Sequence, residues 1–189
     1  TVIKPYLRNE LFEGIVGKSE YIKLYTEDFI DTSNIVLISI HDPDSQKFND
    51  DMVSRFQDSI QVQFWDIEET IGKYEIISDE IAEELREFIN KNKDRRFFIH
   101  CHAGQSRSAG VGMAVECIVK YNGNKYDYSI GGGDITSHNR YSPNMVVYDK
   151  IIGGWMFREL IEMYCCCCST QQQQDAVVLK LQSMKFWMA

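Results

Sequence analysis

The chain has 189 residues, of which 44% are hydrophobic and 25% charged, values typical of a globular domain. Its formal net charge of -8 argues against a general nucleic-acid binder or a protein of anionic membrane surfaces. There is no leader-like N-terminus and no apolar run long enough to span a bilayer, so we expect a soluble, cytoplasmic protein without membrane association.

The cysteines separate the chain into a body and a tail. We expect one domain over residues 1–164 and exclude residues 165–189, which open with four consecutive cysteines and a glutamine run, from the fold argument. Acylation, thiolate metal binding and a sequence artefact are the alternatives for this tail. Only Cys101 and Cys117 lie in the body, which indicates a reducing compartment and no disulfide scaffold.

The first predicted elements are short. Residues 12–16 and 21–25 are each compatible with a strand, joined at Gly17-Lys18-Ser19. This tripeptide does not complete a nucleotide phosphate loop, because Phe12 stands where that motif needs its first glycine.

The next segments predict an α/β order. The continuous apolar run at 35–40 is typical of a buried parallel strand, whose following turn, 41–44, should lie near a ligand site. A short amphipathic helix is expected over 48–56. Alternation at 59–64 predicts another strand, which leads into an acidic loop that begins Trp65-Asp66.

Ser78 is the expected N-cap of a helix whose apolar side chains recur at helical spacing up to Ile89. Arg86 lies on the opposite face, which we expect to be solvated. The helix is interpreted as a crossover that brings two parallel strands side by side.

Residues 96–120 are the segment that carries chemistry. An apolar run ending at His100 predicts a buried strand, and the apolar residues from Ser108 onward predict a buried helix. The tight loop between them can turn its amides around an anion, and the helix N-terminus adds partial positive charge. A phosphate-sized dianion is the expected occupant.

Three side chains in this segment predict nucleophilic catalysis. A thiol at a helix N-terminus beside an arginine has a lowered pKa, so Cys101 is the candidate nucleophile. Arg107 can hold two phosphoryl oxygens, and Ser108 can donate a hydrogen bond to the sulfur when it leaves. An inert core cysteine is the alternative, but it would need neither the arginine nor the glycine-bearing loop.

The pattern His100-Cys101-x5-Arg107-Ser108 resembles the signature of cysteine-dependent protein tyrosine and dual-specificity phosphatases. The resemblance spans about residues 35–160 and is most specific at 98–112. It implies an α/β fold with a central, mostly parallel sheet flanked by helices. Trp65-Asp66 lacks the proline of the Trp-Pro-Asp loop found in the longer tyrosine-specific enzymes, which favours a compact, dual-specificity-like enzyme.

The resemblance also implies a general acid on a loop that follows a strand upstream of the nucleophile. An acid is needed because the leaving oxygen must be protonated as its bond to phosphorus breaks. Asp66 is our choice, because it lies on the loop that follows the predicted strand 59–64, upstream of Cys101. The rival candidates for the acid are Glu68, Glu69 and Asp79, and Asp42 is a less favoured one.

Further residues are assigned to the site. The phosphate-binding loop comprises His102, Ala103, Gly104, Gln105 and Ser106. His100 is expected to orient this loop. The segment from Arg140 to Asn144, followed by an apolar helix, is similar to a phosphatase segment whose arginine and asparagine steady the phosphate loop.

We therefore expect a phosphatase that acts through a phosphocysteine on phosphotyrosine, with phosphoserine and phosphothreonine as further protein substrates. No cofactor or metal is needed, because loop amides and Arg107 supply the positive charge. The alternatives are a non-protein substrate (a nucleotide, an RNA 5'-phosphate or a phosphoinositide) and a phospho-binding module with little turnover. The absence of lysine from the loop makes phosphoinositides a less favoured substrate than phosphoproteins.

Overall fold

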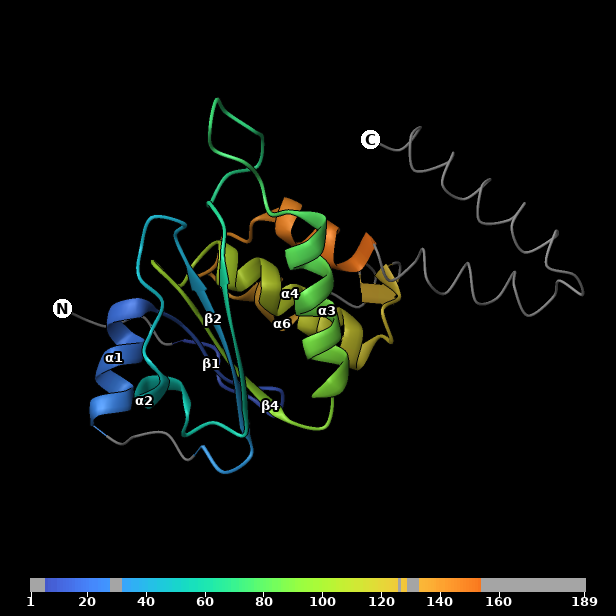
Figure 1. Cartoon of the computed structure of the whole chain (residues 1–189). Coiled ribbons are helices and arrows are strands. Elements are labelled where there is room, and N and C mark those ends of the chain that lie inside the picture. The colour runs from blue at the N-terminus through green and yellow to red at the C-terminus, as the bar shows by residue number, and fades with distance from the viewer. Residues whose placement is uncertain (1–5, 28–31, 126, 129–132, 154–189) are drawn as a thin grey trace, which may run out of the picture. The chain divides into compact units, whose positions relative to one another are not determined.

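The computed structural model describes residues 6–27, 32–125, 127–128 and 133–153. The chain divides into two compact units, Thr1–Ile152 and Gly153–Ala189, and every element labelled in Figure 1 belongs to the first. The Cys- and Gln-rich tail lies outside the described residues, as does the end of the apolar helix expected after Asn144.

Strands and helices alternate along most of the first unit. In chain order they are β1 (Phe12–Gly17), α1 (Lys18–Thr26), β2 (Ile35–His41), α2 (Asp50–Val53), β3 (Asp58–Gln63), α3 (Asp79–Lys91), β4 (Arg96–Cys101), α4 (Arg107–Lys120) and α6 (Asp134–Ser137). Residues 145–152 are also helical. None of the described helices has the length and apolar character needed to cross a membrane.

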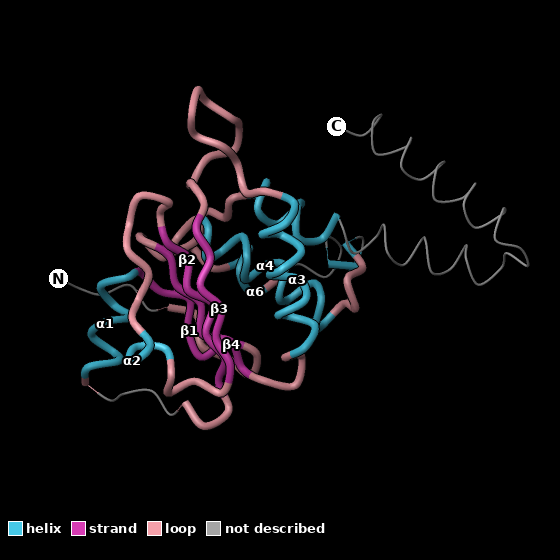
Figure 2. Tube along the Cα trace, viewed as in Figure 1, coloured by secondary structure: helices cyan, strands magenta, loops and turns pink. Residues whose placement is uncertain are grey.

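The four strands form one sheet in the order β1-β4-β2-β3, and every neighbouring pair is parallel. Helices α1 and α2 cover one face, and α3, α4 and α6 lie on the other (Figures 1 and 2). The predicted α/β fold with a parallel sheet flanked by helices is therefore confirmed. Because all strands run the same way, their carboxyl ends meet at one edge of the sheet, where α/β proteins bind ligands.

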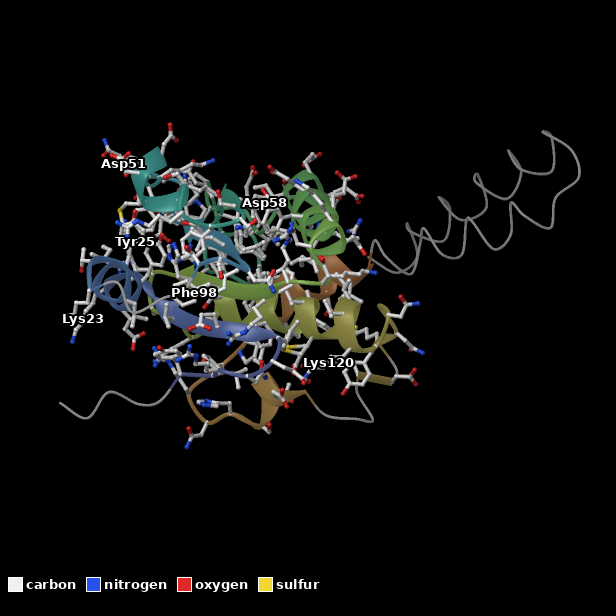
Figure 3. The ribbon with its side chains drawn as sticks, turned by 90° about the horizontal axis from the view of Figure 1, so that it is seen from below. Lys23, Tyr25, Asp51, Asp58, Phe98 and Lys120 are labelled. Carbon is white, nitrogen blue, oxygen red and sulfur yellow. The ribbon has the colours of Figure 1, made fainter. Side chains whose placement is uncertain are left out.

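An aromatic core fixes α1 and α2 against the sheet. Tyr21 of α1 is fully buried beside Phe56 and Phe98, within the hydrophobic cluster that also holds apolar side chains of β1 and β2. At the surface, the Tyr25 hydroxyl donates a hydrogen bond to the Asp51 carbonyl, which joins the two helices (Figure 3).

Two local expectations are wrong. Residues 21–25 belong to helix α1, which starts directly after β1, where the Glu20 carboxylate accepts from the Gly17 amide as the glutamate of a capping box does. The helix expected over 48–56 is the shorter α2, which Asn49 caps by accepting a hydrogen bond from the Met52 amide.

The α3 prediction is correct in its start and wrong in two other respects. Ser78 caps the helix, as predicted, by accepting from the Ile81 amide. Arg86 is buried rather than solvated, and its Nε donates to the Ile151 carbonyl at 2.6 Å. The crossover does not place β3 beside β4, because β2 lies between them.

Candidate active site

Cys101 is the last residue of β4, a central strand of the sheet, and α4 begins after a five-residue loop, 102–106. Its side chain is buried. The Gly104 amide donates to the Cys101 sulfur at 3.2 Å, and Ser108 Oγ lies 3.2 Å from the same sulfur. The loop therefore curls over the thiol, and Ser108 is placed to hydrogen-bond with it.

The connection between β1 and α1 packs directly against this loop. Gly104 has a φ of +70°, and a Cβ at this position would collide with backbone atoms of Val16 and Gly17. The Lys18 amide donates to the His102 carbonyl at 3.1 Å. The loop shape thus depends on the close approach of two backbone segments, which only glycine at 104 permits.

Arg107 is oriented by the ends of β2 and β3. Its Nη1 donates to the Phe64 carbonyl at 2.8 Å, and its Nη2 forms a 2.8 Å ion pair with Asp42. The side chain is 3% exposed, and Nε has no hydrogen-bond acceptor among the described residues. This nitrogen faces Asp66, whose Oδ2 lies 3.7 Å away, so the two groups attract each other by charge without a hydrogen bond.

Asp66 lies beside Arg107 and is held by two neutral side chains. Its Oδ1 accepts from Ser106 Oγ at 2.7 Å and from Asn144 Nδ2 at 3.1 Å, while Oδ2 lies 3.7 Å from Arg107 Nε. Its side chain remains 33% exposed. The carboxylate thus touches both the loop and the arginine and can still reach a ligand.

Asn144 joins the Asp66 segment to the loop. Its amide nitrogen also donates to the Ile67 carbonyl at 3.2 Å, and its backbone amide donates to the Ser106 carbonyl at 3.2 Å. Its side-chain oxygen accepts from the Val147 amide, as an N-cap residue does at the start of a helix. The expected supporting residue therefore contacts the candidate acid itself.

The rival carboxylates lie in different surroundings. Asp42 contacts Arg107 more closely than Asp66 does, so the turn after β2 lies at the site, as predicted. Asp79 pairs with Lys150 at 2.8 Å, at the start of α3. Glu68 and Glu69 are solvent-exposed. Two aspartates, Asp42 and Asp66, are therefore brought to Arg107.

His100 is fully buried and belongs to a chain of polar side chains inside the sheet. Ser39 Oγ lies 2.7 Å from His100 Nε2 and 2.7 Å from His41 Nε2, which in turn lies 3.1 Å from Gln61 Oε1. The Tyr21 ring stacks on His100. Burial, followed by the charge of His41, lowers the pKa of His100 to about 3, so the imidazole is neutral at physiological pH.

Sequence reasoning missed the partners of His100, since no local pattern links Ser39 and Gln61 to it. Burial likewise lowers the pKa of His41. The parallel pairings of β2 with β4 and with β3, which set Ser39 opposite both His100 and Gln61, bring these residues together.

Arg140 supports the site indirectly. It forms an ion pair with Glu20, whose carboxylate accepts from the Gly17 amide at 2.9 Å. Arg140 thus acts on the β1–α1 connection on which Gly104 rests. Glu20, three residues after Gly17, could have been found from its capping-box spacing.

The other loop residues lie at the rim. His102, Ala103 and Gln105 are exposed, and the Gln105 carbonyl accepts from the Ser142 amide at 3.0 Å. His102 Nδ1 lies 3.9 Å from an oxygen of Asp42. These side chains are placed to contact what surrounds a bound phosphate.

No protein-family model matches the chain, and no curated protein sequence matches it. Several solved structures are similar to it, among them the following three. The human tyrosine phosphatase-like serine/threonine/tyrosine-interacting protein is 16% identical, with 79% of this chain and 90% of that chain covered and a TM-score of 0.48. The Yvh1 phosphatase domain from Chaetomium thermophilum is 15% identical, with 77% and 90% covered and a TM-score of 0.46. PTPMT1, solved in complex with PI(5)P, is 12% identical, with 76% and 92% covered and a TM-score of 0.44.

Proposed function

We propose that this protein is a cysteine-dependent phosphatase that hydrolyses phosphate monoesters, with phosphotyrosine in proteins as the main substrate and phosphoserine and phosphothreonine as further ones. The observation that carries the proposal is the grouping of Cys101, Arg107 and Asp66 at the carboxyl edge of the sheet. The Gly104 amide donates to the Cys101 sulfur, and the buried Arg107 side chain lies 3.7 Å from Asp66 Oδ2.

The first step forms a phosphocysteine. The Cys101 thiolate attacks phosphorus, and the bond from phosphorus to the ester oxygen breaks with its electron pair on that oxygen. Asp66 gives its proton to this oxygen, so the leaving group departs as a neutral alcohol or phenol. Arg107 and the loop amides stabilise the phosphoryl oxygens.

The second step restores the enzyme. Water attacks phosphorus while the Asp66 carboxylate takes its proton, and the sulfur departs as a thiolate. Ser108, 3.2 Å from the sulfur, donates a hydrogen bond to it as it leaves. A compartment that keeps thiols reduced, such as the cytosol, preserves this chemistry.

The test is hydrolysis of para-nitrophenyl phosphate, with Cys101→Ser expected to abolish turnover. Asp66→Asn should lower kcat by about 10²–10⁴-fold, the usual contribution of a general acid. Asp42→Asn is the matched control, because Asp42 also contacts Arg107. It should mainly raise KM, since it orients the arginine.

The pattern across substrates identifies the acid. Losing the acid should slow an alkyl phosphate more than an aryl phosphate, because the alkoxide is the poorer leaving group. The same selectivity in Asp42→Asn instead of Asp66→Asn would reassign the acid. Vanadate binding by a wild-type protein without turnover would make it a phosphate-binding module.

A further inference from the structure

The loop between β3 and α3 forms a finger, residues 65–77, that projects from the body of the domain (Figure 1). Its tip is closed by paired backbone hydrogen bonds: the Ile71 amide donates to the Tyr74 carbonyl at 3.0 Å and the reverse at 3.1 Å. Gly72 between them has a φ of +61°, as a tight turn requires. The Tyr74 ring packs edge-on against Trp65, 4.9 Å between centroids. The finger is therefore preformed, which lowers the entropic cost of binding through it.

The base of the finger is part of the active site. Asp66 accepts from Ser106 of the Cys101 loop, and Asn144 holds both Asp66 and the Ile67 carbonyl. A ligand whose phosphate sits over Cys101 can therefore continue along the finger. The proposed function places the phosphate end of that ligand over Cys101 and beside the buried Arg107 guanidinium, which faces Asp66 at 3.7 Å.

The tip exposes apolar surface. Ile71 is 57% exposed and Tyr74 is 41% exposed. Met145, 43% exposed, directly follows Asn144 in the chain, so it also lies near the finger base. The remaining large exposed apolar side chain of the described residues is Ile22, on α1. Two of the four large exposed apolar side chains of the described residues therefore lie on the tip of the segment that carries Asp66.

The negative charge of the finger favours a basic partner over an anionic one. Glu68, Glu69 and Glu75 are all exposed, against one lysine, Lys73, which lies over the Tyr74 ring. An anionic bilayer or a polyphosphorylated small molecule would be repelled by these carboxylates. A polypeptide with basic and apolar side chains beside its phosphorylated residue complements both the charge and the exposed rings.

We propose that the finger is a docking element for such a phosphorylated polypeptide, with Ile71 and Tyr74 contacting an apolar side chain and the glutamates a basic one. This inference rests on the proposed function, because it places the scissile phosphate over Cys101. It identifies the substrate class as protein segments that carry basic and apolar side chains beside the phosphorylated residue.

The test compares the double variant Ile71→Ser/Tyr74→Ser with Ile22→Ser, a control that removes an exposed apolar side chain elsewhere. The probe is a phosphotyrosine peptide with Arg and Leu beside the phosphorylated residue. Its kcat/KM, divided by that for para-nitrophenyl phosphate, should fall about tenfold in the double variant, as for a loss of central interface contacts. The ratio should stay constant in Ile22→Ser.

A binding measurement separates docking from turnover. In a Cys101→Ser background, fluorescence anisotropy should show about tenfold weaker binding of the peptide to the finger variant. A peptide with Glu and Ser at the flanking positions should bind more weakly and respond little to the variant.

An unchanged ratio and unchanged binding would overturn the docking role while leaving the phosphatase intact. Peptide binding that depends on the finger in a protein without turnover would refute the proposed enzyme and retain the docking element. Finger-dependent binding to phosphoinositide vesicles, with no preference between the peptides, would show that the finger docks on a membrane and not on a polypeptide.

Discussion

Gly104 is the point where the loop over Cys101 meets the β1–α1 connection, so Gly104→Ala tests the architecture of the site. Its φ of +70° is left-handed, which costs an L-residue about 1–2 kcal/mol. A Cβ would also lie under 3.0 Å from backbone atoms of Val16 and Gly17, which cannot rotate aside. Overpacking adds about 1–3 kcal/mol, so the free energy of unfolding should fall by about 2–5 kcal/mol.

The same substitution should impair turnover. The Gly104 amide donates to the Cys101 sulfur, and a shift of about 1 Å in such a group can cost roughly 100-fold in kcat/KM. The control is Gly72→Ala: φ is +61° there too, but no atom lies within 4 Å of the Cβ position. It should lose only about 1–2 kcal/mol. Urea unfolding and initial rates of para-nitrophenyl phosphate hydrolysis measure both effects, and equal losses in the two variants would refute the role assigned to crowding.

Further predictions follow from the buried polar groups. Asn144→Ala should lower kcat by about 10-fold or more with little change in KM, because it frees Asp66 and the base of the finger; a change in KM alone would contradict this. His100 has a folded-state pKa below its unfolded value, so the stability that neutral His100 contributes is present above about pH 6.5 and is lost as the pH falls toward 3. Urea unfolding at pH 7 and pH 5 should show this loss in the wild type and a smaller one in His100→Gln, in which His41, whose pKa burial also lowers, still titrates. Burial raises the pKa of Glu116, so its stability contribution is present below the ordinary carboxyl pKa and is lost as the pH rises through the folded value. Glu116→Gln should therefore be more stable than the wild type to urea at pH 8, and no more stable than it at pH 4.

The parts of the fold that could be predicted are those written in local sequence. The apolar run at 35–40 and the run ending at His100 form β2 and β4, since a strand buried on both faces needs continuous apolar residues. Ser78 and the apolar spacing after it define α3 for a similarly local reason. In the site, the loop between β4 and α4 could be placed because its ends are set by the strand and the helix.

The wrong predictions concern interactions between distant segments. Residues 21–25 fit a strand pattern, but Tyr21 is buried on a helix because it packs under His100 and Phe98. Arg86 looked solvated because its acceptor, the Ile151 carbonyl, lies 65 residues away. The strand order depends on which neighbours bury the most apolar surface, which no single segment encodes.

The same distinction divides the site. The candidate nucleophile and the candidate phosphate-binding arginine follow from one short segment, but the candidate acid depends on tertiary contacts. Asp42 and Asp66 are both aspartates in turns after strands, and both reach Arg107. Asp66 differs because Ser106 and Asn144 attach it to the Cys101 loop, a fact set by the chain beyond residue 140.

The position of Asp66 at the base of the finger links recognition to proton transfer. Cys101 and Arg107 are held by strand ends and loop backbone, so they are in place whether or not a substrate touches the finger. Asp66 shares its segment with Ile71 and Tyr74, so in the proposed enzyme we expect contacts at the tip to steady the carboxylate in addition to its bonds to Ser106 and Asn144. Binding energy from a remote part of a substrate is then used in the transition state rather than only in affinity. A phosphopeptide shortened so that it no longer reaches the tip should therefore lose kcat as well as affinity.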